Sequence, residues 1–133
     1  MKYQICLSGA ARGNSVEKGK KMAFELGRSI AKAGHTLITG ATIGLPNVAA
    51  EGAKSAGGLS IGVSPAVSRI EHTRKYHLPT EAYDAILFSG QHYLRRDVLL
   101  VATSDAVICI GGRIGTLHEF AVAVEMHKPI GVL

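Results

Sequence analysis

Residues 106–120 read AVICIGGRIGTLHEF, and this stretch decides the fold of the 133-residue chain. An apolar run stops at Gly111 and Gly112, and a helix-like pattern begins at Thr116. This order predicts a buried strand that turns into the N-terminus of a helix. Glycines let the backbone approach a ligand closely, and the free N–H groups of a helix N-terminus suit an anion such as phosphate. We therefore expect a phosphate-binding turn, with the carboxylate of Glu119 beside it.

Strand-like and helix-like segments alternate along the whole chain. Strands are expected at 3–9, 35–40, 59–64, 85–88, 106–110 and 130–133, and helices at 14–33, 46–56, 92–103 and 116–126. Asn14 and Glu17 fit a capping pair for the first helix. This alternation predicts a single Rossmann-like α/β domain over 1–133, a doubly wound and mainly parallel sheet with helices on both faces. Because the pattern stops inside the last strand, either the sheet ends there or a C-terminal extension is missing.

Composition narrows the class of protein. The formal charge of +5 suits phosphorylated small molecules, and the basic residues are too scattered to favour nucleic acid. Cys6 and Cys109 lie in separate apolar runs, so we expect two buried thiols in a reducing compartment, with a disulfide as the alternative. No metal-binding spacing, signal peptide or membrane-spanning run is visible. These features predict a cytoplasmic protein without a metal or organic cofactor.

Three predicted strands end in small, glycine-bearing turns, at 8–11, 39–44 and 110–116. In a parallel sheet the carboxyl ends of all strands share one edge, where doubly wound proteins bind ligands. We therefore expect one nucleotide-sized pocket. The chain lacks a Gly-x-Gly-x-x-Gly turn, an acid after the second strand and a triphosphate-binding loop, so a mononucleotide or a phosphosugar fits better than a dinucleotide. The residues expected to line the pocket are Ser8, Gly9, Gly40, Gly44, Gly111, Gly112, Gly115 and Thr116.

Several polar residues near these turns allow two interpretations. Thr116 and Glu119 also form a capping box, in which the carboxylate would fold back on the backbone and do no chemistry. Arg96 opens a helix that leaves the carboxyl end of a strand, so it either points into the pocket or lies on a solvated helix face. His118 could act as a general acid or base, but a place at the surface is the simpler expectation. The irregular segment 66–84 is long enough to be functional or mobile.

The residues from Gly111 to Glu119 resemble the Pro-Gly-Gly-x-Gly-Thr-x-x-Glu signature of the LOG (Lonely Guy) family, also labelled "possible lysine decarboxylase". Arg96 stands at the distance of the family's second signature, an arginine in a Glu-Arg-Lys context. The resemblance implies a homodimeric phosphoribohydrolase, which cleaves the N-glycosidic bond of an N6-modified adenosine monophosphate to a free base and ribose 5-phosphate. It also implies that Arg96 and Glu119 are the catalytic pair and that Gly112, Gly115 and Thr116 hold the 5′-phosphate.

The chain departs from the LOG signatures at three positions. Ile110 replaces the proline, and Arg95 and Asp97 flank Arg96 where the family has Glu and Lys. These changes bring the chain closer to molybdenum-cofactor carrier-like relatives, which share the fold and a glycine turn. The alternative to hydrolysis is therefore a non-catalytic protein that binds or carries a nucleotide or the molybdenum cofactor.

Overall fold

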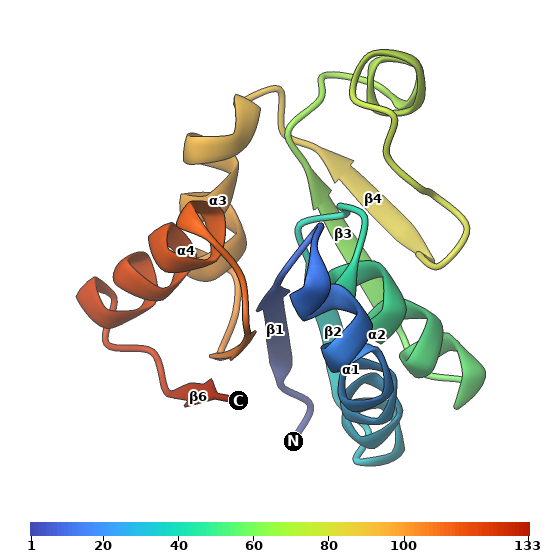
Figure 1. Ribbon diagram of the computed structural model, residues 1–133, viewed down its shortest axis with the longest axis vertical. Coiled ribbons are helices and arrows are strands. Elements are labelled where there is room, and N and C mark those ends of the chain that lie inside the picture. The colour runs from blue at the N-terminus through green and yellow to red at the C-terminus, as the bar shows by residue number, and fades with distance from the viewer.

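A single parallel sheet of six strands organises the molecule, and the computed structural model describes all residues from 1 to 133 (Figure 1). The strands lie in the order β4-β3-β2-β1-β5-β6 and every neighbouring pair is parallel. Their bounds are β1 Gln4–Gly9, β2 Thr36–Thr39, β3 Ser60–Ser64, β4 Ala85–Phe88, β5 Ala106–Ile110 and β6 Ile130–Val132. The predicted α/β class and parallel sheet are confirmed.

Four α-helices cover the two faces of this sheet. Their bounds are α1 Asn14–Lys32, α2 Leu45–Ser55, α3 His92–Ala102 and α4 Ile114–Glu125. In Figure 1, α1 and α2 lie together on one side of β1, and α3 and α4 lie together on the other. Each face has its own apolar core, and successive residues of β1 serve both: Leu7 packs with α1 and α2, and Cys6 with α3 and α4. None of the helices combines the length and apolar composition needed to cross a lipid bilayer.

The predicted side-chain capping is wrong at two helix N-termini. Helix α1 begins at Asn14 with Gly13 as its N-cap, and no side chain caps it, so Asn14 and Glu17 do not form the predicted capping pair. Helix α4 begins at Ile114 rather than Thr116. In both cases the turn before the helix is glycine-rich, and its backbone starts the helix without a side-chain acceptor. Cys6 and Cys109 are buried, free thiols, as expected, and they do not form the alternative disulfide.

The irregular segment 66–84 is a well-tethered loop that contains one five-residue π-helical turn, η1 Glu71–Lys75. His72 is fully buried within it. Its Nδ1 lies 2.8 Å from the hydroxyl of Ser64, and its Nε2 lies 2.9 Å from the carbonyl of Pro79. The first contact attaches the loop to the end of β3, and the second joins two parts of the loop. Together they explain why so long a connection is ordered.

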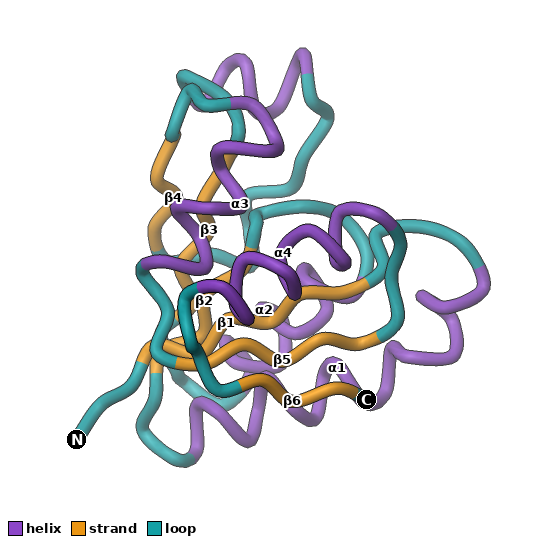
Figure 2. The backbone as a smooth tube through the Cα atoms, turned by 90° about the vertical axis from the view of Figure 1, so that its left-hand side faces the viewer, coloured by secondary structure: helices purple, strands orange, loops and turns teal.

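The chain reverses its direction across the sheet between β1 and β5. It runs outward from β1 through β2 and β3 to β4, then crosses to β5 on the other side of β1. Figure 2 shows the strands and the crossing segments from a second side. At such a switch point the connections after the two strands diverge to opposite faces and leave a crevice at the carboxyl ends. The turns after Gly9 and after Ile110 border this crevice.

Candidate functional site

A cavity of about 630 Å³ opens at the carboxyl ends of β1 and β5, at the switch point of the sheet. All three predicted turns reach it, so the expectation of one shared edge is confirmed. The predicted site residues that line this cavity are Ser8, Gly9, Gly40, Arg96, Gly115, Thr116 and Glu119. Residues that the sequence analysis did not select also line it, among them Arg12, Tyr93, Asp97, Arg113 and His118.

Three of the predicted glycines lie outside the cavity wall. Gly44 is the N-cap of α2, where its positive φ of 82° and close contact with the Ala10 and Ala11 backbone suit only glycine. Gly111 and Gly112 turn the chain between β5 and α4, with φ of 55° and 113°. A side chain on Gly112 would overlap that of Thr116. These glycines shape the turns, and they do not themselves face the cavity.

The N-terminus of α4 presents unpaired backbone N–H groups. The first hydrogen bond of the helix runs from Leu117 N to the carbonyl of Arg113, over 2.9 Å, and no side chain caps this end. The amides of Ile114, Gly115 and Thr116 therefore have no partner within the helix. All three residues line the cavity. The positive end of the helix dipole and these amides together form a site suited to an anion.

Glu119 does not cap α4. Thr116 is the third residue of the helix rather than its cap, so the predicted capping box is wrong, and Glu119 lies in the second turn. Glu119 is 8% exposed at the wall of the cavity. Burial raises the pKa of its carboxyl group to about 7, the nearby carboxylate of Asp97 adds to this rise, and the Ser8 hydroxyl and Arg96 guanidinium oppose it. The group thus changes its charge near neutral pH.

Arg96 is buried in the wall of the cavity, where it contacts the ends of two strands. It is 3% exposed, and its Nη1 donates to the backbone carbonyls of Gly40 and Val63, the latter over 3.1 Å. Its Nε lies 3.0 Å from Asp97 Oδ1. The guanidinium also lies over the ring of Tyr93, 5.5 Å from the ring centre. Of the two positions considered for Arg96, the structure shows the one at the cavity.

Asp97 and His118 form a pair that the sequence analysis missed. His118 Nδ1 lies 3.0 Å from Asp97 Oδ2, across the contact between α3 and α4. Asp97 is buried and His118 is half-buried in the cavity wall, so the expected surface position of His118 is wrong. The available signal was the position of His118 directly before Glu119. Its partner Asp97 lies 21 residues earlier in the chain, and nothing in the sequence links the two residues.

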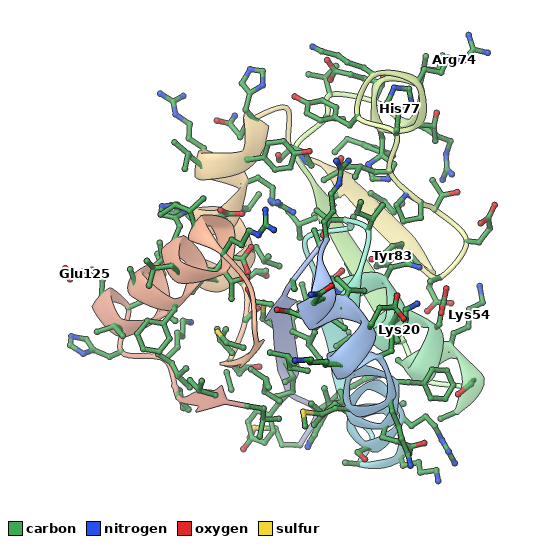
Figure 3. The ribbon with its side chains drawn as sticks, viewed as in Figure 1. Lys20, Lys54, Arg74, His77, Tyr83 and Glu125 are labelled. Carbon is green, nitrogen blue, oxygen red and sulfur yellow. The ribbon has the colours of Figure 1, made fainter.

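Charged side chains of both signs border the cavity. Three arginines, Arg12, Arg96 and Arg113, line the cavity together with the acidic residues Asp97 and Glu119. Arg12 and Arg113 adjoin the glycine turns before α1 and α4, a position that could have marked them in the sequence. The charged residues of the loop 66–84 take no part: Figure 3 shows Arg74 and His77 on the coil at the far end of the molecule, away from α4. The cavity therefore combines a positive rim with a buried acidic wall.

The chain as a whole is similar to known proteins. The family described as "SLOG cluster4 family" matches residues 2–133. An uncharacterized protein of Archaeoglobus fulgidus is 35% identical over 130 residues, which are 98% of this chain and 79% of that protein. The X-ray structure of TM1055 superposes with a TM-score of 0.86 at 26% identity, covering 98% of this chain and 72% of the other. The molybdenum cofactor carrier protein of Chlamydomonas reinhardtii superposes with a TM-score of 0.84 at 32% identity, covering 99% and 76%.

Proposed function

The chain belongs to the SLOG cluster4 family, and from this membership and the chemistry of the cavity we propose that it hydrolyses the N-glycosidic bond of a nucleoside 5′-monophosphate. The products would be a free base and ribose 5-phosphate. One observation carries the proposal: the carboxyl group of Glu119 is buried in the same cavity wall that presents the free amides of α4. A phosphate bound at those amides brings the attached sugar toward the carboxyl group.

The phosphate end of the substrate is assigned to the start of α4. The amides of Ile114, Gly115 and Thr116 would donate to the phosphate oxygens, and the helix dipole favours the negative charge. Arg12 and Arg113 border the same cavity and add positive charge at its rim. Gly115 leaves room for close approach, because a Cβ built on it meets no atom within 4 Å.

The chemical step is assigned to Glu119. Cleavage of the glycosidic bond builds positive charge on the ribose C1′, which an adjacent carboxylate stabilises. The same carboxylate accepts a proton from the water whose oxygen bonds to C1′, so that the nucleophile is activated as the bond to the base breaks. With a pKa of about 7, Glu119 is ionised in a large part of the molecules at neutral pH and is basic enough to take that proton.

Arg96 and the apolar wall would position the rest of the substrate. Nη1 and Nε of Arg96 are engaged with the protein, so Nη2 is the group left to donate to a ribose hydroxyl or to the base. Tyr93, Leu94 and Leu117 line the cavity and are 45%, 68% and 59% exposed. An aromatic ring and two aliphatic side chains suit the flat face of a heterocycle.

A second candidate is a carrier that binds a phosphorylated heterocycle and releases it unchanged. It is favoured by the 32% identity to a protein described as a molybdenum cofactor carrier. The α4 amides and the basic rim suit any phosphorylated cargo, the molybdenum cofactor included. The two candidates differ in Glu119, because a carrier has no need of a buried carboxyl group that titrates near neutral pH.

The deciding experiment is to incubate the purified protein with AMP and with N6-modified AMP and to measure free base and ribose 5-phosphate. We expect turnover by the natural chain, loss of at least about 100-fold in kcat for Glu119→Gln, and nearly unchanged binding of ribose 5-phosphate. Glu125→Gln is the matched control, since Glu125 lies on the same helix at its outer end, away from the cavity (Figure 3). Saturable binding without any turnover would instead establish the carrier.

We also propose that the protein is a homodimer formed through α3 and α4. Apolar side chains of these helices are exposed, including Val98 at 40% and Val124 at 51%. Exposed apolar surface on neighbouring helices is typical of an interface. Sedimentation velocity is expected to show a dimer for the natural chain and a monomer for the Val98→Glu, Val124→Glu double variant. A monomeric natural chain would contradict this arrangement.

A further inference from the structure

The imidazole of His118 is held by Asp97 with one ring nitrogen left free. Asp97 Oδ2 lies 3.0 Å from His118 Nδ1, and the Asp97 carboxylate is 4% exposed, whereas the His118 side chain is 32% exposed. A carboxylate only accepts hydrogen bonds, so Nδ1 carries the proton in this contact. Nε2 has no hydrogen-bond partner in the protein, and the residue borders the same cavity as Glu119.

The proposed hydrolysis needs a proton donor that the residues assigned so far do not supply. When the glycosidic bond breaks, its electron pair moves onto the departing base, which leaves far more readily once it is protonated. Arginines are too weakly acidic to give up a proton. Burial raises the pKa of Tyr93 above its ordinary value, which makes its hydroxyl a poorer donor. Glu119 is occupied as the base that receives the proton of water.

We infer that His118 is the proton donor to the departing base and that Asp97 is its positioning residue. The inference rests on the proposed hydrolysis. A carboxylate bound to Nδ1 fixes the orientation of the ring and leaves Nε2 free to donate a proton to the substrate. The adjacent positions of His118 and Glu119 in α4 bring a proton donor and a proton acceptor to one cavity.

The step balances as follows in atoms and protons. The bond between C1′ and the base nitrogen breaks, and its electron pair goes to the base. Nε2 of His118 gives its proton to the base, which leaves neutral. The oxygen of one water bonds to C1′, and the proton lost by that water goes to the carboxylate of Glu119. Exchange with solvent then returns a proton to His118 and removes one from Glu119.

Charged side chains of both signs share the cavity with His118. Asp97 binds it directly, and the carboxyl group of Glu119 lies in the same wall. The other charged or titratable side chains lining the cavity are Arg12, Tyr93, Arg96 and Arg113, from the loop before α1, from α3 and from the start of α4.

The test compares two substrates with different leaving groups. AMP carries adenine, which needs a proton as it leaves, and 4-nitrophenyl ribofuranoside 5-phosphate carries a nitrophenolate, which does not. For His118→Gln we expect kcat/KM with AMP to fall by about 100-fold or more and kcat/KM with the nitrophenyl substrate to fall less than about fivefold. His127→Gln is the matched control, because His127 is exposed in the turn after the C-terminal end of α4 and does not line the cavity.

The outcomes separate this inference from the function on which it rests. Equal losses with both substrates would overturn the role of His118 and leave the hydrolysis standing. Absence of turnover with both substrates in the natural chain would overturn the hydrolysis, and the proton-donor role with it. Unequal losses, largest with AMP, would support the role.

A second variant tests Asp97 as the positioning residue. Asp97→Asn keeps a side chain of the same size but replaces the carboxylate, which only accepts from Nδ1, with an amide that can also donate to it. We expect kcat with AMP to fall by about tenfold at little change in KM, again with a smaller effect on the nitrophenyl substrate. Nitrogen NMR of the imidazole is expected to show the proton on Nδ1 in the natural chain and a mixture of tautomers in Asp97→Asn. A proton on Nε2 alone in the neutral ring of the natural chain would overturn the assignment.

Discussion

The guanidinium group of Arg96 occupies the space that a side chain on Gly40 would fill. Nη1 of Arg96 donates to the backbone carbonyl of Gly40, and a Cβ built on Gly40 would overlap the guanidinium. Gly40 lies in the turn after β2, and Arg96 lies on α3, 56 residues later in the chain. The sequence predicts Gly40 as a ligand contact, and the structure shows Arg96 packed directly against it.

Gly40→Ala is expected to displace Arg96. Forcing an extra methyl group into this packed site costs roughly 1 to 3 kcal/mol of the free energy of unfolding. The displaced Arg96 would also no longer be in place to donate to the ribose. Ribose 5-phosphate should therefore bind more weakly to this variant. Urea unfolding and calorimetric titration with ribose 5-phosphate measure the two effects. Gly131→Ala is the control, since its Cβ would meet only Ile108 at 3.8 Å; equal stability of both variants would contradict the expected overlap.

Gly115→Ala separates ligand binding from folding. A Cβ at position 115 meets no protein atom within 4 Å, and alanine is favoured over glycine in a helix by up to about 1 kcal/mol. The variant should therefore be as stable as the natural chain or slightly more stable. If the phosphate sits on the α4 amides, the added methyl group obstructs it, and the Kd for ribose 5-phosphate should rise by about tenfold. An unchanged Kd would place the phosphate elsewhere.

Glu119→Gln should stabilise the protein at alkaline pH. The pKa of Glu119 rises from an ordinary value of 4.5 to about 7 in the folded state, mainly through burial. Between these pH values the folded state binds more protons than the unfolded state, so stability falls as the pH rises, and the full cost is present above pH 7. The variant lacks this cost, which is at most about 3 kcal/mol. Urea unfolding should show the gain at pH 8 and little gain at pH 4. A gain of equal size at both pH values would argue against a raised pKa.

The rate should depend on pH through the same carboxyl group. Hydrolysis requires ionised Glu119, so kcat/KM with the nitrophenyl substrate should rise with pH through about 7 and then level off. This substrate isolates Glu119, because its leaving group needs no proton. A pH–rate profile of the natural chain provides the measurement, with Glu125→Gln as the control. A flat profile between pH 5 and pH 8 would remove Glu119 from the step.

The order of strands and helices was largely predictable, because it depends on local properties of the chain. The apolar run 106–110 and the strand at 85–88 were predicted with the bounds that the structure shows. Helix starts were less predictable. The pattern placed caps at Asn14 and Thr116, where capping side chains were present, but the backbone of the preceding glycine turns had already begun both helices.

The acidic centre of the site was only partly predictable. The place of Glu119 after the glycine turn predicts it as a site residue, whereas its raised pKa follows from burial in the fold and from Asp97 of another helix. In the sequence Asp97 stands beside Arg96 and marks only a departure from the LOG signature. His118 was expected at the surface, because the residues on one helix do not reveal which side chain of a neighbouring helix will reach them.

By itself, the sequence determined the alternating strands and helices, the glycine turns at the strand ends and the carboxylate near the last of them. These follow from hydrophobic period and from the backbone freedom of glycine, which act within a few residues. Tertiary structure alone decided that Arg96 sits against Gly40 and that Asp97 holds His118. The reason is that the strand order sets which distant segments meet, and many strand orders satisfy the same pattern of apolar residues along the chain.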